Sequence, residues 1–304
     1  MKSGAGRGAD LRFEPVTFGA GFTGRVGRLV ARFMALGHTR EGIGLGTQNE
    51  SGEEWLGFRP YRPGDDLRRL DPDLLARLDK PYVSVTRRES SELWAVVVDG
   101  SASMGVGEGR SKLQAAAELS IALCALAARR RARVRLSIVD EQGITRTDLA
   151  PRDPLGRALA AWSGRRPGGT RGLAEVVRDG SCDRELARAG RLVLLGDLEG
   201  IEPADLVGRL RPGRQLMVGA LLAGEELNPA LTEAITWTSA ESGSQVAAPA
   251  DPRLADRYER RLGARLESFR TALTRHRAAF MVMDSRAPFE EHALDLASHS
   301  FNRR

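Results

Sequence analysis

The chain has 304 residues, of which 41% are hydrophobic and 28% charged, as in an ordinary soluble globular protein. Aromatic residues make up only 5%, so the core must be built mainly from Leu, Val, Ala and Ile. No apolar run approaches the roughly 20 residues that a transmembrane helix needs, and residues 1–10 lack the apolar stretch of a signal peptide. We therefore expect a cytoplasmic protein with no membrane segment.

The net charge of +6 raises the question of nucleic-acid binding. The basic residues are nearly all arginines spread along the chain, and the densest run, Arg129–Arg131, follows a predicted helix, where cations complement the helix dipole. We expect a solvated basic surface and no nucleic-acid partner. The two cysteines, Cys124 and Cys182, are expected to be free thiols, although a disulfide between them stays open.

The N-terminal third contains few regular elements. Residues 1–10 are predicted to be disordered, and residues 21–36 have apolar positions at helical spacing. A loop then leads to a short extended segment around Trp55–Arg59, and residues 81–88 alternate as a half-buried strand does. We assign residues 11–87 to an N-terminal segment that packs on the domain that follows.

From residue 93 onwards, apolar strands alternate with helical segments. Such alternation predicts an α/β fold with a doubly wound, mainly parallel sheet flanked by helices, in a domain spanning residues 88–304. Ligands of such sheets bind at the carboxyl ends of the strands. The strands are expected at 93–98, 134–139, 191–196 and 215–222, and the helices near 112–131, 153–163, 171–178, 203–210, 254–277 and 289–299.

Two of these strands are followed directly by an acidic residue. Asp99 ends the first strand and begins Asp-Gly-Ser-Ala-Ser, which places Ser101 and Ser103 at alternate positions behind it. Asp197 follows the strand 191–196. Ligands that are all oxygen suit a hard cation, so these residues favour Mg²⁺, with Mn²⁺ or Ca²⁺ as the other ions of this kind.

The pattern Asp99-x-Ser101-x-Ser103 resembles the metal-ion-dependent adhesion site of the von Willebrand factor A family. That family completes the motif with a distant Thr and a distant Asp, and Thr170 and Asp197 stand in the corresponding order. The resemblance implies a von Willebrand factor A-like fold whose bound metal is completed by a carboxylate from a partner. A purely structural alternative stays open, in which Asp99, Thr170 and Asp197 only cap the turns or helices that follow them.

A second resemblance lies in residues 57–77, GFRPYRPGDDLRRLDPDLLAR. It is similar to the signature of an uncharacterised family called domain of unknown function fifty-eight, and the likeness spans roughly residues 38–300. Leu70 replaces the usual Ile, and Pro72 stands where Trp is usual. The segment could equally be a charged structural clasp. The matching positions are Arg59, Tyr61, Gly64, Asp65, Arg68, Asp71, Ala76 and Arg77.

This second resemblance implies a protein partner, since members of the family resemble companions of MoxR-type AAA+ ATPases. We expect a non-catalytic adaptor that joins such an ATPase to a client protein, with association at the periphery of a membrane complex left open. The alternative is a metal-dependent, phosphatase-like hydrolase that uses Asp99. Haloacid-dehalogenase-like phosphatases need a second carboxylate two residues later, where Ser101 stands. Neither a Gly-x-Ser-x-Gly elbow nor a P-loop is present.

Overall fold

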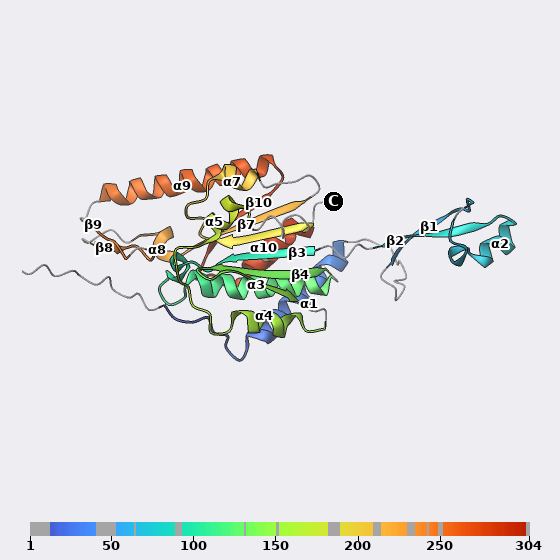
Figure 1. Cartoon of the computed structure of the whole chain (residues 1–304), viewed down its shortest axis with the longest axis horizontal. Coiled ribbons are helices and arrows are strands. Elements are labelled where there is room, and N and C mark those ends of the chain that lie inside the picture. The colour runs from blue at the N-terminus through green and yellow to red at the C-terminus, as the bar shows by residue number, and fades with distance from the viewer. Residues whose placement is uncertain are drawn as a thin grey trace, which may run out of the picture. The chain divides into compact units, whose positions relative to one another are not determined.

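The computed structural model divides the chain into two compact units, residues 1–34 with 93–304, and residues 35–92 (Figure 1). The disorder predicted for residues 1–10 falls outside the residues that the structure describes, as does Cys182. The described residues are 13–40, 53–63, 65–88, 93–130, 132–149, 152–181, 189–208, 214–229, 235–241, 243–248 and 252–301.

The larger unit is built on a six-stranded sheet with the order β10-β7-β6-β3-β4-β5. Five strands are parallel to their neighbours, and β5 at one edge runs antiparallel to β4. With helices on both faces, this sheet confirms the predicted α/β fold with a mainly parallel sheet. The strands are β3 (Leu93–Asp99), β4 (Arg133–Asp140), β5 (Gly143–Leu149), β6 (Arg191–Gly196), β7 (Gln215–Leu222) and β10 (Ala279–Asp284).

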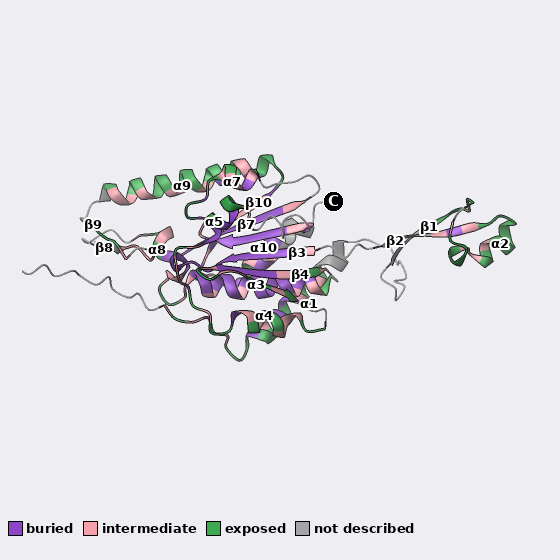
Figure 2. Cartoon of the chain, in the orientation of Figure 1, coloured by how far each residue is buried: buried purple, intermediate pink, exposed green. Residues whose placement is uncertain are grey.

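Each face of the sheet has its own apolar layer, because successive side chains of a strand point to opposite sides. Trp94, Val96 and Val98 pack with one set of helices, whereas Ala95 and Val97 pack with the other. The inner strands β3, β6 and β7 between these layers are almost wholly buried (Figure 2). The first set is α1 (Phe22–Arg40), α3 (Lys112–Arg129), α4 (Pro154–Trp162) and α10 (Phe289–Phe301); the second is α5 (Leu173–Asp179), α7 (Pro203–Val207) and α9 (Pro252–Arg275).

The start of helix α1 belongs to this larger unit. Phe22, Val26, Leu29 and Phe33 lie at helical spacing and are buried in the same apolar cluster as α3 and α10. Arg25 also forms an ion pair with Glu290 of α10, at 2.6 Å. Residues 11–87 are therefore not one segment: the apolar stripe of α1 holds the chain up to residue 34 on the sheet, and a separate unit begins at residue 35.

The smaller unit is an antiparallel pair of strands, β1 (Glu53–Pro60) and β2 (Tyr82–Arg88), with a 3₁₀ turn (Leu67–Arg69) and helix α2 (Pro72–Leu78) between them. Among its residues with a described exposure, only Val83 is buried. Four large apolar side chains of this unit are exposed: Phe58, Leu67, Leu75 and Leu78. So few buried groups give such a small unit little stability of its own.

Some short elements were not predicted from the sequence. Strand β5 occupies a sheet edge and mixes polar with half-buried positions, so it lacks the apolar run that marks the inner strands. The same holds for the hairpin of β8 (Ile235–Thr238) and β9 (Gln245–Ala248). Short helices η2 (Ala102–Gly105) and α8 (Gly224–Leu227) follow β3 and β7. Within the described ranges, none of the helices is both long and apolar enough to cross a membrane.

Candidate functional site

Asp99 and Asp197 lie at the carboxyl ends of two neighbouring strands, β3 and β6. From β3 the chain passes to β4 on one side, and later returns to β6, β7 and β10 on the other. The sheet order therefore reverses between β3 and β6, and this switch point is where open α/β sheets bind ligands. The apolar strand LWAVVV is buried on both faces, which fixes the position of the carboxylate that ends it.

The Asp99 carboxylate is 4% exposed and is held on both oxygens. Its Oδ1 accepts the Ser101 N–H at 2.9 Å, and its Oδ2 accepts the Leu173 N–H at 3.0 Å. A Cβ on Gly196 would lie 2.9 Å from the Asp99 Cβ, so the next strand can pass this close only as glycine. Burial, together with the negative charge of Asp197, raises the pKa of Asp99 to about 6.

Two buried hydroxyls lie beside the carboxylates. The Ser101 and Ser103 hydroxyls are hydrogen-bonded to each other at 3.1 Å. Ser103 also donates a hydrogen bond to Asp197. The side chain of Ser101, which precedes η2, is also hydrogen-bonded to Asp99. The structure thus brings four of the five predicted ligands together: Asp99, Ser101, Ser103 and Asp197.

Asp197 differs from Asp99 because a cation faces it. Its Oδ2 accepts a hydrogen bond from the Lys112 ammonium at 3.0 Å, and its Oδ1 accepts the Glu199 N–H at 3.0 Å. Burial by itself raises the pKa of Asp197, but the charge of Lys112 and the three hydrogen bonds from Ser103, Glu199 and Lys112 together lower it. Asp197 is therefore ionised more readily than Asp99.

Thr170 lies on a loop that touches the site through its backbone. Gly169 accepts the Ala102 N–H at 3.0 Å, and Gly168 donates its N–H to Gly100 at 3.1 Å. The Thr170 side chain itself is exposed. Helix α5 begins at Leu173 with Gly172 at its N-cap, so Thr170 is not the cap of that helix.

The capping alternative is partly realised for the two carboxylates. Asp99 accepts the N–H of Ser101, and Asp197 accepts that of Glu199, each two residues ahead, which is an ordinary turn contact. Asp197 does not cap α7, whose N-cap is Glu202. Each turn contact uses only one oxygen of its carboxylate. Capping therefore does not explain why the four side chains lie together.

Sequence reasoning missed Lys112, whose side chain is only 1% exposed in this site. Its ammonium contacts Asp197 Oδ2 at 3.0 Å and Glu226 Oε1 at 2.7 Å. Ser111 caps α3, so Lys112 stands at the first helical position, where the helix dipole disfavours a cation. The sequence did contain one indication of this contact: a lysine at the first position of a helix rich in Ala and Leu needs acidic partners.

More carboxylates surround the mouth of the site. Burial, and then the charges of Glu199, Asp197, Asp99 and Glu175, raise the pKa of Glu241. The negative potential that this implies favours a cation. Described residues contain no cluster of three His, Cys, Asp or Glu side chains placed to share a metal. The donor set here, two carboxylates with hydroxyls, is nevertheless one that suits a hard ion such as Mg²⁺.

The backbone after Asp197 is strained. Leu198 has a φ of +59°, which a branched side chain rarely adopts, and it is buried. Its carbonyl accepts hydrogen bonds from the Ile201 N–H at 3.1 Å and from Arg265 of α9 at 2.6 Å. Helix α9 thereby fixes the turn that positions Asp197.

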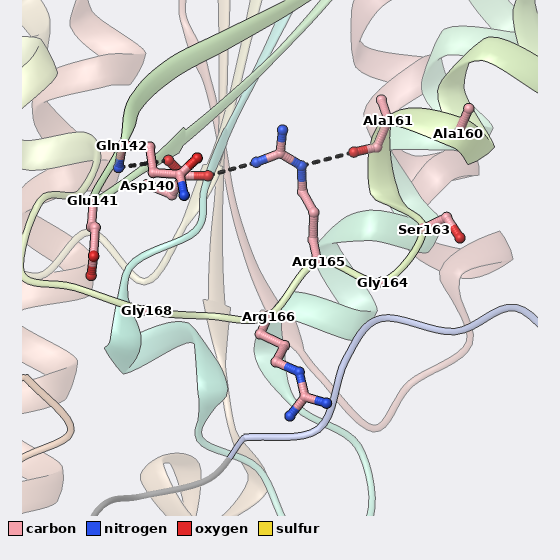
Figure 3. Close-up of a pocket in the computed structure, with 10 residues that line it drawn as sticks. All are labelled: Asp140, Glu141, Gln142, Ala160, Ala161, Ser163, Gly164, Arg165, Arg166 and Gly168. Atoms are coloured by element: carbon pink, nitrogen blue, oxygen red, sulfur yellow. Dashed lines mark hydrogen bonds and ion pairs between the residues drawn. The ribbon is translucent and has the colours of Figure 1, made fainter.

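A pocket of about 490 Å³ lies beside the site (Figure 3). Arg165 crosses it, with an ion pair to Asp140 at 2.6 Å and a hydrogen bond to the Ala161 carbonyl at 2.8 Å. Gly168 lines the pocket and bonds to Gly100, the residue after Asp99. The pocket contains none of the five predicted ligands.

The family signature of residues 57–77 has structural roles in the smaller unit. Arg59 and Asp65 form a bidentate ion pair with both contacts at 2.6 Å, and the pair lowers the pKa of Asp65 to about 2. Asp71 caps α2 by accepting the Leu74 N–H at 2.9 Å. Pro72 then occupies the first position of α2, which explains why this helix accommodates a proline there.

The remaining signature residues have less defined roles. Tyr61 is half-buried and donates its backbone N–H to the Pro81 carbonyl at 2.9 Å. Arg68, Ala76 and Arg77 are exposed. Gly64 lies outside the described residues. The Arg59–Asp65 pair supports the clasp interpretation for this part of the segment.

Fold and site together define the class of protein: an α/β protein with buried oxygen ligands at the switch point of a mainly parallel sheet. A family model described as "Protein of unknown function DUF58" matches residues 57–260, and the chain belongs to this family, as the sequence predicted.

Curated relatives and solved structures are also similar. The chain is 30% identical over 236 residues to "Uncharacterized protein Mb1516" of Mycobacterium bovis and to "Uncharacterized protein Rv1480" of Mycobacterium tuberculosis, covering 73% of this chain and 70% of each relative. BatB from Bacteroides thetaiotaomicron is 10% identical with a TM-score of 0.38, over 68% of this chain and 97% of that one. An aerotolerance-related membrane protein from Bacteroides fragilis is 11% identical with a TM-score of 0.39, over 68% and 98%.

Proposed function

We propose that this chain is a non-catalytic, metal-assisted protein-interaction module. One observation carries the proposal: Asp99, Ser101, Ser103 and Asp197 converge in a buried site, and within the described residues Asp99 has no ion-pair partner. A buried carboxylate without a counter-charge is costly, and a bound cation removes that cost.

The residues fit Mg²⁺, and by the same chemistry Mn²⁺ or Ca²⁺. Asp99 and Asp197 would supply charge, and Ser101 and Ser103 would supply hydroxyl oxygens. Thr170 would contribute directly or through water from the loop that bonds to η2. When bound, the ion supplies an electrophilic centre that captures a carboxylate of a partner, as the resemblance to von Willebrand factor A domains implies.

The partner that we propose is a MoxR-type AAA+ ATPase, for which this chain acts as an adaptor toward a client, in the cytoplasm or at the periphery of a membrane complex. The pocket beside Gly168 offers room for the partner segment that carries the carboxylate. A second contact is supported by the exposed apolar side chains Leu67, Leu75 and Leu78 of the smaller unit.

Two measurements test the proposal. Mg²⁺ should raise the melting temperature of the wild type, because a ligand that binds only the folded state adds about 2.7 kcal/mol at a hundredfold excess over its Kd. The purified ATPase should be captured with Mg²⁺ and lost with EDTA. Asp99→Asn should lose both effects. Asp148→Asn, which removes the same charge from an edge-strand ion pair with Arg135, should keep both.

Capture that is equal with and without EDTA would overturn the metal-assisted mechanism. The alternative function is a metal-dependent, phosphatase-like hydrolase that uses Asp99, but Ser101 stands where a phosphatase of the haloacid-dehalogenase kind needs its acid. Phosphatase activity with Mg²⁺ or Mn²⁺ that disappears in Asp99→Asn would replace the adaptor by a hydrolase.

A further inference from the structure

Lys112 is the least exposed cation of the candidate site, and it bridges two carboxylates. Its ammonium lies 3.0 Å from Asp197 Oδ2 and 2.7 Å from Glu226 Oε1. These contacts raise the pKa of Lys112 despite a burial that alone would lower it. A buried lysine at the positive end of α3 thus depends on its two acidic partners.

The charges of the buried cluster do not balance without a further cation. Asp99, Asp197 and Glu226 carry three negative charges when ionised, and Lys112 carries one positive charge. A divalent cation would bring the cluster to neutrality. Lys112 and such an ion, however, compete for the same oxygen, since Asp197 Oδ1 already accepts the Glu199 N–H.

We infer that Lys112 is the resident cation of the site, and that a divalent ion binds by displacing its ammonium from Asp197 while Glu226 retains it. The inference rests on the proposed function and names the residues that regulate it. Glu226 is placed for this role, because its Oε2 is fixed by the Ala223 N–H at 2.7 Å and its Oε1 remains for Lys112. The lysine has a flexible stem and three donors, so it can keep one partner and release the other.

The exchange of the Lys112 ammonium for a divalent ion would regulate how tightly the site holds the ion. Each ion that binds must overcome the contact between Lys112 and Asp197, so the free protein holds the ion weakly. A partner carboxylate adds a negative ligand and shifts the exchange toward the ion. Metal and partner therefore raise each other's affinity, as linkage requires.

The test measures Mn²⁺ binding by calorimetry with the full chain, and stability in EDTA by urea unfolding. In Lys112→Met the competitor is lost, so Mn²⁺ should bind about tenfold or more tightly, given the strength of a charge contact in a protein interior. In Glu226→Gln the displaced ammonium loses its charged partner while the Ala223 contact remains, so Mn²⁺ should bind more weakly. Arg135→Met is the matched control, because it also replaces one cation by methionine. Arg135 lies on β4 opposite Ala95, four residues before Asp99, so this variant should bind Mn²⁺ as the wild type does.

Opposite shifts in the two variants support the exchange, whereas a merely structural lysine would change stability in EDTA without opposite shifts in affinity. If the wild type binds Mn²⁺ and Lys112→Met binds equally or less tightly, the exchange is wrong and the metal site stands. If only Lys112→Met binds, the resident cation is established and metal-assisted function fails. Binding by neither overturns both. Should Lys112→Met not fold, unchanged or tighter binding by Glu226→Gln overturns the exchange.

Discussion

Two aspartates on adjacent strands acquire different properties from their surroundings. Asp99 accepts hydrogen bonds from two backbone N–H groups and from the Ser101 side chain, but burial and the charge of Asp197 outweigh them, so its pKa rises. Asp197 faces Lys112 and Ser103, and its pKa falls. The site therefore pairs one carboxylate that already has a cation with one that lacks it, and the second carries the proposed metal function.

The raised pKa of Asp99 predicts a pH dependence. An acid whose pKa is higher in the folded chain than its ordinary 3.8 binds its proton more tightly when folded. In EDTA, the free energy of unfolding that Asp99 contributes should rise by the order of 1–2 kcal/mol as the pH falls from about 7.5 to about 5.

Urea unfolding of wild type and Asp99→Asn across this range measures the effect. The difference between the two proteins should move in favour of the wild type as the pH falls. Carboxylates with lowered pKa values, such as Asp148 and Asp284, act in the opposite direction but are present in both proteins, so they cancel. Parallel curves would show that Asp99 has an ordinary pKa.

At the scale of elements, the site depends on close contacts between segments far apart in the sequence. The start of α5 donates its Leu173 N–H to Asp99, and η2 bonds to the loop before α5 through Ala102 and Gly169. Strand ends, η2 and the α4–α5 loop therefore form one hydrogen-bonded edge. A change in any of them moves the carboxylate.

Gly172, in the loop before α5, lies tightly against Asp99. A Cβ there would lie 3.1 Å from Asp99 Oδ1 and 3.1 Å from the Ser101 Cβ. Because two N–H groups hold the carboxylate, it has little room to yield. Gly172→Ala should lower the free energy of unfolding by about 1–3 kcal/mol, as overpacking does, and should weaken any Mg²⁺-induced rise in melting temperature.

Gly168→Ala is the control in the same loop, since a Cβ there meets no atom within 4 Å and its N–H to Gly100 is retained. This variant should behave as the wild type in urea and thermal unfolding. Equal behaviour of both alanine variants would mean that the loop adapts and does not constrain Asp99.

At the scale of the whole molecule, the chain is divided into a large α/β unit and a small unit of residues 35–92. The large unit contains both apolar layers and all four converging side chains. The small unit has a very small hydrophobic core, and its Leu67 and Leu78 side chains are exposed. We infer that the large unit provides stability and the proposed metal site, and that the small unit provides contact surface.

Replacing residues 41–92 by a flexible Gly/Ser linker of about 20 residues, which spans roughly 25 Å, tests this division. The shortened chain should unfold cooperatively and keep the Mg²⁺ response of the full protein, while capture of the ATPase should fall. Thermal unfolding and the capture assay measure the two effects. Loss of cooperative unfolding would show that the small unit is part of the stable core.

The sequence by itself determined the sheet and the two acidic strand ends. Runs such as LWAVVV and RLVLLG are apolar throughout because inner parallel strands are buried on both faces, and this pattern is local. The motif from Asp99 to Ser103 and the segment 57–77 are also local, so the family could be recognised. Edge strand β5 lacked such a pattern.

Only the tertiary structure decided which charges meet. In the sequence, Lys112 lies 85 residues from Asp197 and 114 residues from Glu226, and no local pattern links the three. It also placed Gly172 against Asp99, left the Thr170 side chain exposed and assigned the start of α1 to the larger unit. Periodicity reports which face of an element is buried, whereas the identity of the neighbour, and hence the charge balance, depends on the packing of distant elements.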